Sequence, residues 1–156
     1  MKTAIWIAAV AQIFAASPSF AQLYAAAGFN NLHQPNDTVP GADAGLGYRV
    51  GQYLGVEGGY EGAYSNIPFS GAYLVGILYL PLGRTGFEVY ADAGGLVLTG
   101  ETTDTTGTFT HWASGLRADA GLQYDITPVW GIRAAYRFQT PLAHMTAETI
   151  GLTFSF

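Results

Sequence analysis

Apolar and polar residues alternate with a period of two along most of the chain after residue 22. The alternation runs through seven segments, residues 23–30, 43–51, 54–61, 87–94, 116–124, 130–139 and 149–156. Successive side chains of a β-strand point to opposite faces, so each segment would have one apolar face and one polar face. None of this part has a long apolar run or a 3.6-residue stripe typical of an amphipathic helix. The pattern predicts seven β-strands.

An eighth segment, residues 71–80, is apolar on both faces, so its orientation is harder to assign. Tyr73 and Tyr79 share one face and are six residues apart, which is about 20 Å along a strand. That distance is close to the separation of the two interfaces of a membrane. We therefore expect the odd-numbered positions of this strand to face lipid.

The second face of the seven alternating strands consists mainly of charged residues and glycine. A soluble sandwich would expose a polar face to water and would rarely use so many glycines there. A small closed barrel requires this composition inside, because its interior has room only for side chains and glycine must offset each large one. The apolar face would then contact lipid. Strands cross a bilayer only when the sheet is closed, because an open edge leaves backbone amides unpaired in hydrocarbon.

Short and long connections alternate between the predicted strands. The short ones are residues 51–53, 81–86 and 125–128, and the long polar ones are residues 31–41, 62–70, 98–110 and 141–146. Outer-membrane barrels place short turns on the periplasmic side and longer loops outside. The predicted fold is therefore all-β, an eight-stranded antiparallel up-and-down transmembrane β-barrel.

Aromatic residues at the ends of the apolar faces suggest two interfacial girdles. The expected periplasmic girdle contains Tyr53, Tyr79, Tyr124, Trp130 and Phe156, and the expected outer girdle contains Phe29, Tyr60, Trp112 and Phe138.

Composition supports the same class of protein. Charged residues make up 11% of the 156 residues, less than half of the roughly 25% found in soluble domains. The chain has no Cys, which excludes a disulfide framework and a thiolate metal site. A net charge of −5 excludes a basic nucleic-acid-binding surface.

The first 21 residues have the layout of a secretory signal peptide. Lys2 precedes an apolar stretch, and Ser19-Phe20-Ala21 forms a small-x-small site before Gln22. The apolar stretch of about 13 residues is too short to span roughly 30 Å of hydrocarbon as a helix. We expect residues 1–21 to be a cleaved signal peptide and residues 22–156 to be the barrel.

Three segments resemble those of small outer-membrane barrels of the OmpA-like or opacity type. Residues 22–29 resemble the first strand of that family, and residues 124–138 resemble its third periplasmic hairpin. The last segment, residues 149–156, alternates and ends in Phe156. It resembles the assembly signal that the barrel-insertion machinery reads in this family. The resemblance covers residues 22–156 and implies a Gram-negative outer-membrane location.

Charged residues on the predicted inner face are candidates for a lumen network. They are Arg49, Glu57, Glu88, Asp92, Arg117, Asp119, Arg133 and Arg137, together with Asp43 and Glu61. A first hairpin centred near Gln52 would place Glu57 one step from Arg49. A third hairpin centred near Thr127 would place Asp119 level with Ala135, diagonally between Arg133 and Arg137. Buried charges need partners, so a structural network of ion pairs is the first interpretation and an ion pathway the second.

Other candidate sites are weaker. His33, His111 and His144 lie in or beside predicted outer loops, where they could converge on a metal, but their spacing matches no ligand motif. His111 and Ser114 would point to opposite faces of a strand, which disfavours the catalytic dyad of a lipid A deacylase. Residues 102–108 are a Thr-rich polar loop that could form an adhesive tip. We expect no catalytic, cofactor-binding or metal-binding residues.

The sequence leaves three classes of function. A structural or surface-interaction protein of the outer membrane is favoured over a lipid-modifying enzyme and over a small low-conductance pore. The expected partners are outer-membrane lipids and lipopolysaccharide, and the barrel-insertion machinery during biogenesis. No nucleic acid or cofactor is expected, and the sequence does not identify a surface ligand.

Overall fold

The structure is a computed structural model that describes residues 21–34, 37–63, 69–104, 107–140 and 145–156. The expected signal peptide lies almost entirely outside these residues, so its cleavage remains a prediction. The strands are β1 (Ala21–Gln34), β2 (Asp37–Val50), β3 (Leu54–Ala63), β4 (Phe69–Pro81), β5 (Phe87–Asp104), β6 (Gly107–Asp125), β7 (Trp130–Gln139) and β8 (Met145–Ser155). The described part contains no helix long and apolar enough to cross a membrane.

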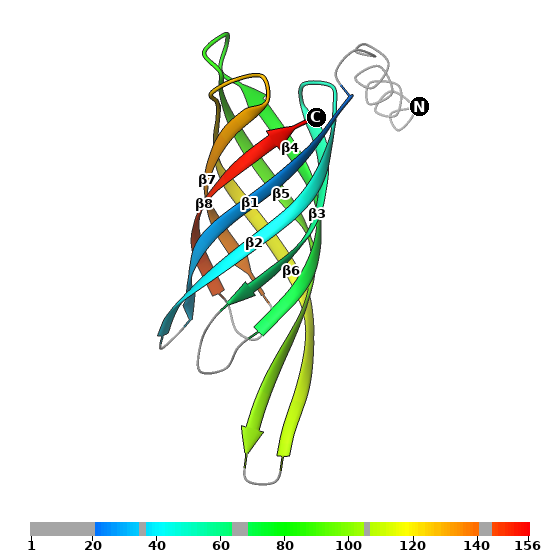
Figure 1. Cartoon of the computed structure of the whole chain (residues 1–156), viewed down its shortest axis with the longest axis vertical. Coiled ribbons are helices and arrows are strands. Elements are labelled where there is room, and N and C mark those ends of the chain that lie inside the picture. Colours follow the sequence, from blue (N-terminus) through cyan, green and yellow to red (C-terminus); the bar gives the residue numbers. More distant parts are fainter. Residues whose placement is uncertain (1–20, 35–36, 64–68, 105–106, 141–144) are drawn as a thin grey trace, which may run out of the picture.

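The eight strands form one closed antiparallel barrel in which each strand pairs with its neighbours in the sequence (Figure 1). β1 also pairs with β8, from Tyr24 opposite Ser155 to His33 opposite Thr146. This last pairing closes the sheet, so along the paired stretches of the described strands the backbone amides and carbonyls are bonded between neighbouring strands. The predicted fold class is confirmed.

The two ends of the barrel differ. At one end, which we call the short-turn end, tight connections join β2 to β3, β4 to β5 and β6 to β7 (Figure 1). Two of these turns use glycines with positive φ, Gly51 at 66° and Gly83 at 70°, a backbone conformation that glycine adopts without steric cost. The opposite end, which we call the loop end, carries the other connections.

The hairpin of β5 and β6 projects beyond the rest of the loop end (Figure 1). Its strands pair from Phe87 opposite Tyr124 to Asp104 opposite Gly107. Residues 98–104 and 107–110, which were expected to be loop, are therefore strand. Continued cross-strand pairing explains the difference, because Thr and Phe fit a pleated sheet as well as they fit a loop.

The outer face of the barrel is an apolar belt. Large side chains on it are strongly exposed, including Phe29 at 74%, Leu46 at 61%, Leu116 at 67% and Ile150 at 64%. These positions belong to the apolar halves of the predicted strands. The assignment of inner and outer faces is therefore correct for the segments that alternate.

The expectation for residues 71–80 was wrong. Tyr73, Val75, Ile77 and Tyr79 are buried inside the barrel, and the even-numbered positions of β4 are exposed. Tyr79 is 1% exposed, so it does not belong to the periplasmic girdle. The membrane-spanning distance between the two tyrosines was a coincidence of spacing. Their hydroxyls bond to other buried groups inside the barrel.

Inward-facing glycines make room for the inward-facing tyrosines. The ring of Tyr24 lies against Gly47, its direct cross-strand partner, at the place where a Cβ would be. The hydroxyl of Tyr73 would lie 2.6 Å from a Cβ on Gly45 and 2.5 Å from one on Gly59. The glycine-rich inner face is thus the complement of its large side chains.

This packing predicts that Gly47→Ala destabilises the barrel, because the new methyl group would overlap the ring of Tyr24. Overpacking of this kind costs about 1–3 kcal/mol. Gly76→Ala is the matched control, since a Cβ there meets nothing within 4 Å. We expect the control to change the free energy of unfolding by less than about 0.5 kcal/mol. Urea unfolding in lipid vesicles measures both, and equal effects would contradict the proposed fit.

Candidate functional site: the barrel lumen

Five charged side chains from four strands form a central charge cluster in the lumen: Asp43 on β2, Glu61 on β3, Arg117 and Asp119 on β6, and Arg137 on β7. Arg137 contacts Asp43 at 2.6 Å, Asp119 at 3.0 Å and Glu61 at 3.2 Å. Arg117 contacts Glu61 and Asp119, each at 3.0 Å. Both guanidinium groups therefore bridge acids from opposite walls, which ties the strands together across the barrel.

A second group surrounds Glu57, which is 3% exposed. Arg133 donates to its carboxylate at 2.9 Å, and the hydroxyls of Tyr24 and Tyr73 donate at 2.8 and 3.0 Å. Tyr79 in turn donates to the hydroxyl of Tyr24 at 3.1 Å. Glu57 is thus a buried carboxylate with three donors, and this saturation offsets the cost of removing its charge from water.

A third group, the ion pair of Arg49 and Glu88, lies nearer the short-turn end. Arg49 donates twice to the carboxylate of Glu88, at 2.7 and 2.8 Å, in the bidentate arrangement that fits guanidinium to carboxylate. Its guanidinium also lies 4.2 Å from the ring centre of Tyr79. Arg49 therefore connects this pair to the tyrosines around Glu57.

The pairings differ from those expected from the sequence. Asp119 lies opposite Arg137 rather than Ala135, because the third hairpin is centred one residue later than predicted. Arg133 accordingly lies opposite Gln123 and reaches Glu57.

The first hairpin has the expected register, centred at Gln52, with Glu57 one step from Arg49. Arg49 faces Gly55 and Glu57 faces Gly47. Arg49 binds Glu88 on another strand instead of Glu57. At the third hairpin, the shift of one residue in the turn centre moves the residue opposite Asp119 by two positions, so side-chain pairing is more sensitive to the turn than face assignment is.

Asp92 lies directly opposite Asp119 on the inner face and is 7% exposed. Its carboxylate accepts the backbone N–H of Asp119 at 3.2 Å. Among the described residues, no Arg or His lies within ion-pairing distance of Asp92. The six lumen acids (Asp43, Glu57, Glu61, Glu88, Asp92 and Asp119) outnumber the four lumen arginines (Arg49, Arg117, Arg133 and Arg137).

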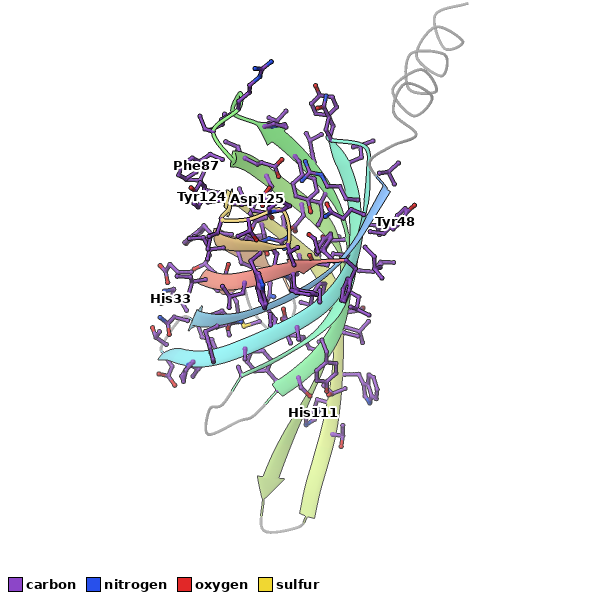
Figure 2. All side chains as sticks on the ribbon, turned by 45° about the horizontal axis from the view of Figure 1, so that its top comes forward. His33, Tyr48, Phe87, His111, Tyr124 and Asp125 are labelled. Carbon is purple, nitrogen blue, oxygen red and sulfur yellow. The ribbon has the colours of Figure 1, made fainter. Side chains whose placement is uncertain are left out.

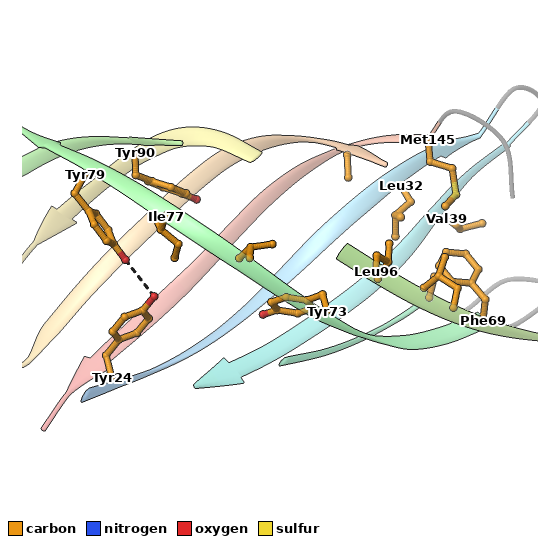
Figure 3. Packing of buried hydrophobic residues seen from close by; sticks show 14 residues of the cluster. Tyr24, Leu32, Val39, Phe69, Tyr73, Ile77, Tyr79, Tyr90, Leu96 and Met145 are labelled. Carbon is orange, nitrogen blue, oxygen red and sulfur yellow. Dashed lines mark hydrogen bonds between the residues drawn. The ribbon is translucent and has the colours of Figure 1, made fainter. Parts of the chain in front are cut away.

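The loop end of the lumen is mainly apolar, with Asn30 buried beside it, and this was not predicted from the sequence. We call this set the apolar layer: Leu32, Val39, Phe69, Leu96, Leu98, Met145 and Ala147, all of them at most 6% exposed. Figure 3 shows Leu32, Val39, Phe69, Leu96 and Met145 gathered at one end of the buried cluster, with Tyr24, Tyr79 and Tyr90 at the other. The run Leu96-Val97-Leu98, apolar on both faces, was the available signal for it.

Small cavities remain in the lumen among the described residues. One of about 40 Å³ lies at the short-turn end beside Arg49, Gln123 and Trp130. Another, about 30 Å³, lies among Asp43, Tyr73 and Arg137. Arg133 lines both cavities. Each has room for a water molecule or two, and their polar linings suit water.

His33 and His111, the two histidines that the structure describes, do not lie together. His33 bonds to Glu148 and Thr38 at the end of β1, and His111 lies well away from it on β6 (Figure 2). His144 lies outside the described residues. Among the residues that the structure describes, no group of three His, Asp or Glu side chains is arranged to hold a metal ion.

The lumen pairings predict that Arg133→Ala destabilises the barrel by about 3–5 kcal/mol, because Glu57 would keep its charge without a cation. In a double-mutant cycle, Arg133→Ala with Glu57→Ala should show a coupling energy of about 0.5–3 kcal/mol. The matched cycle with Asp119→Ala should show a smaller one, since Asp119 binds Arg117 and Arg137. Urea unfolding in vesicles measures both cycles. A larger coupling to Asp119 would refute the observed register.

Comparison with solved structures supports the barrel fold. The N-terminal β-barrel domain of OprF from Pseudomonas aeruginosa superposes with a TM-score of 0.72 at 15% identity, covering 88% of this chain and 100% of that one. Neisserial surface protein A gives 0.66 at 14% identity, covering 87% and 97%. Ail, the attachment invasion locus protein of Yersinia pestis, gives 0.63 at 13% identity with the same coverage. These identities establish a shared fold only. No curated protein matches the chain.

A family model described as the outer membrane protein beta-barrel domain matches residues 3–156, nearly the whole chain. The closed eight-stranded barrel, its apolar outer belt and its charged interior are the features expected of such a domain. The chain therefore belongs to the outer membrane protein beta-barrel domain family.

Proposed function

We propose that this protein is a structural or surface-interaction protein of the outer membrane whose lumen is closed to steady ion flow. The observation that carries the proposal is the filling of the lumen by two kinds of barrier in series. The central charge cluster and the Glu57 group occupy its middle, and the apolar layer occupies its loop end. An ion would have to break buried ion pairs and then cross an apolar constriction.

Planar-bilayer recording tests the closed lumen. We expect the wild-type barrel to show no steady current steps. We also expect Leu98→Ala to stay closed, because that change thins the apolar layer and leaves the charged groups in place. Steady unitary currents from the wild-type protein would overturn this proposal in favour of the small pore.

The loop end supports a surface-interaction role of a restricted kind. A solved structure of Ail is of its complex with the heparin analogue sucrose octasulfate. In this chain, the six Lys and Arg residues are Lys2, the four lumen arginines and Arg84 in a short turn. The loop end therefore has no Lys or Arg with which to bind a polyanion. We propose that its partner is neutral or cationic.

We predict no retention of the folded protein on immobilised heparin at low ionic strength, where surface electrostatics are strongest. The control is a variant with Asp37→Lys and Glu148→Lys at the loop end, which should be retained. Retention of the wild-type protein would contradict a neutral or cationic partner.

The enzyme alternative has less support. His111 and Ser114 are three residues apart on β6, so their side chains leave opposite faces of the strand. Lipid A analysed by mass spectrometry with and without the protein would reveal a deacylase. We propose that no such change occurs.

We also propose that Phe156 acts in assembly. It is 68% exposed, its ring packs edge-on against Phe154, and its backbone N–H donates to Leu23. An exposed terminal aromatic on the outer face contributes little internal packing, which is consistent with recognition by the barrel-insertion machinery.

A further inference from the structure

A shallow apolar groove lies on the outer wall of the barrel, over β2, β3 and β4 at the short-turn end. Its volume is about 380 Å³, and its lining is aliphatic, with Leu54, Val56 and Leu78 among the side chains that form it. Ile77 also borders the groove, but its side chain points into the lumen and is 3% exposed, so it contributes backbone. The groove therefore opens from the hydrocarbon side and has no connection with the charged interior.

The groove exists because a side chain is missing. Gly76 is an outward-facing position of β4 directly opposite Val56, and a Cβ placed on it meets nothing within 4 Å. The neighbouring outward position, Leu78, projects with 46% of its surface exposed. A leucine at residue 76 would fill this space without disturbing the backbone.

An exposed cation, Arg84, lies beyond the groove along the chain, in the turn that follows β4. From Leu78, β4 continues three residues to Pro81, about 10 Å along the strand, and then enters the turn that contains Arg84. Arg84 is exposed, and it is the one Lys or Arg on the outer surface of the described residues. Short turns of such barrels lie on the periplasmic side, where Arg84 would be at the level of lipid headgroups.

We propose that this groove is a binding site for one acyl chain of an anionic phospholipid in the periplasmic leaflet, with Arg84 contacting its phosphate. The aliphatic lining accommodates a hydrocarbon tail, and guanidinium is the side chain best suited to a phosphate. An acyl chain gains no hydrophobic free energy by moving from the lipid into the groove. The tail is therefore held by close packing in the groove, and the headgroup is held by its charge.

A second copy of the chain fits the groove less well. Stable protein interfaces involve about 20–30 residues on each side. This groove is formed by seven residues. A single acyl chain is an occupant of the right scale, and the phosphate contact gives the site its charge preference.

Native mass spectrometry tests the proposal. Phosphatidylglycerol or phosphatidylethanolamine with identical acyl chains is added to the folded protein in detergent, and the protein is then released from detergent in the spectrometer. The wild-type protein should retain one phospholipid and prefer phosphatidylglycerol by about threefold, the size of one exposed charge contact. Gly76→Leu should lose the retained lipid.

Gly95→Leu is the matched control. Gly95 is an outward-facing position on β5 where a Cβ also meets nothing within 4 Å, but it does not line the groove. The control should retain lipid like the wild type, and a faster mobility of unboiled samples on SDS gels verifies that both variants are folded. Equal retention by wild type and Gly76→Leu, or equal loss by both leucine variants, would overturn the proposal.

Arg84→Gln tests the contribution of the headgroup contact separately from that of the acyl chain. This exposed turn substitution should abolish the preference for phosphatidylglycerol while one lipid is still retained, and an unchanged preference would refute the role of Arg84.

Because the chain has no Cys, Gly76→Cys introduces a single thiol. Disulfide-linked dimers of that variant in membranes would identify a second copy as the occupant instead.

Discussion

Closure of the sheet with only eight strands is the constraint on which the rest of the structure depends. A closed wall satisfies the backbone hydrogen bonds that hydrocarbon cannot satisfy. The same closure leaves an interior just wide enough for side chains. Large inward residues therefore find space against glycines, as Tyr24 does against Gly47, and most inward charges pair with a charge from another wall. Asp92 instead accepts a backbone N–H. The alternation of the sequence, the glycines and the ion pairs are all consequences of that narrow interior.

The lumen meets this constraint in two different ways along its length. In its middle, Arg117 and Arg137 each bridge acids from β2, β3 and β6, so charge pairing also fastens the walls to one another. At the loop end, aliphatic side chains and Phe69 pack without polar partners. Replacing a buried ion pair by packed apolar groups is often neutral for stability, so both solutions are stable fillings of the same space. The combination of these two fillings in series is the basis for proposing that the lumen is closed to ions.

The outer wall carries a second set of features that bear on function. The chain belongs to a family of outer-membrane β-barrel domains. An apolar belt on the outer face is required of any such barrel, because that face contacts lipid. The groove beside Gly76 lies on this wall, and the exposed Arg84 lies at its short-turn end. A loop end without Lys or Arg likewise restricts which molecules can bind there.

The sequence by itself determined the fold class, the number of strands, the membrane-facing sides of the seven alternating strands and the identity of the inward charges. It could do so because a period of two is a local property that closure then enforces on every strand. It failed on β4, whose two faces are equally apolar, so that only the tertiary structure decided that Tyr73 and Tyr79 face inward. The sequence also did not determine which charged residues pair with one another. Arg133 and Glu57 are 76 residues apart, and their contact depends on register and on the width of the lumen, neither of which local alternation records.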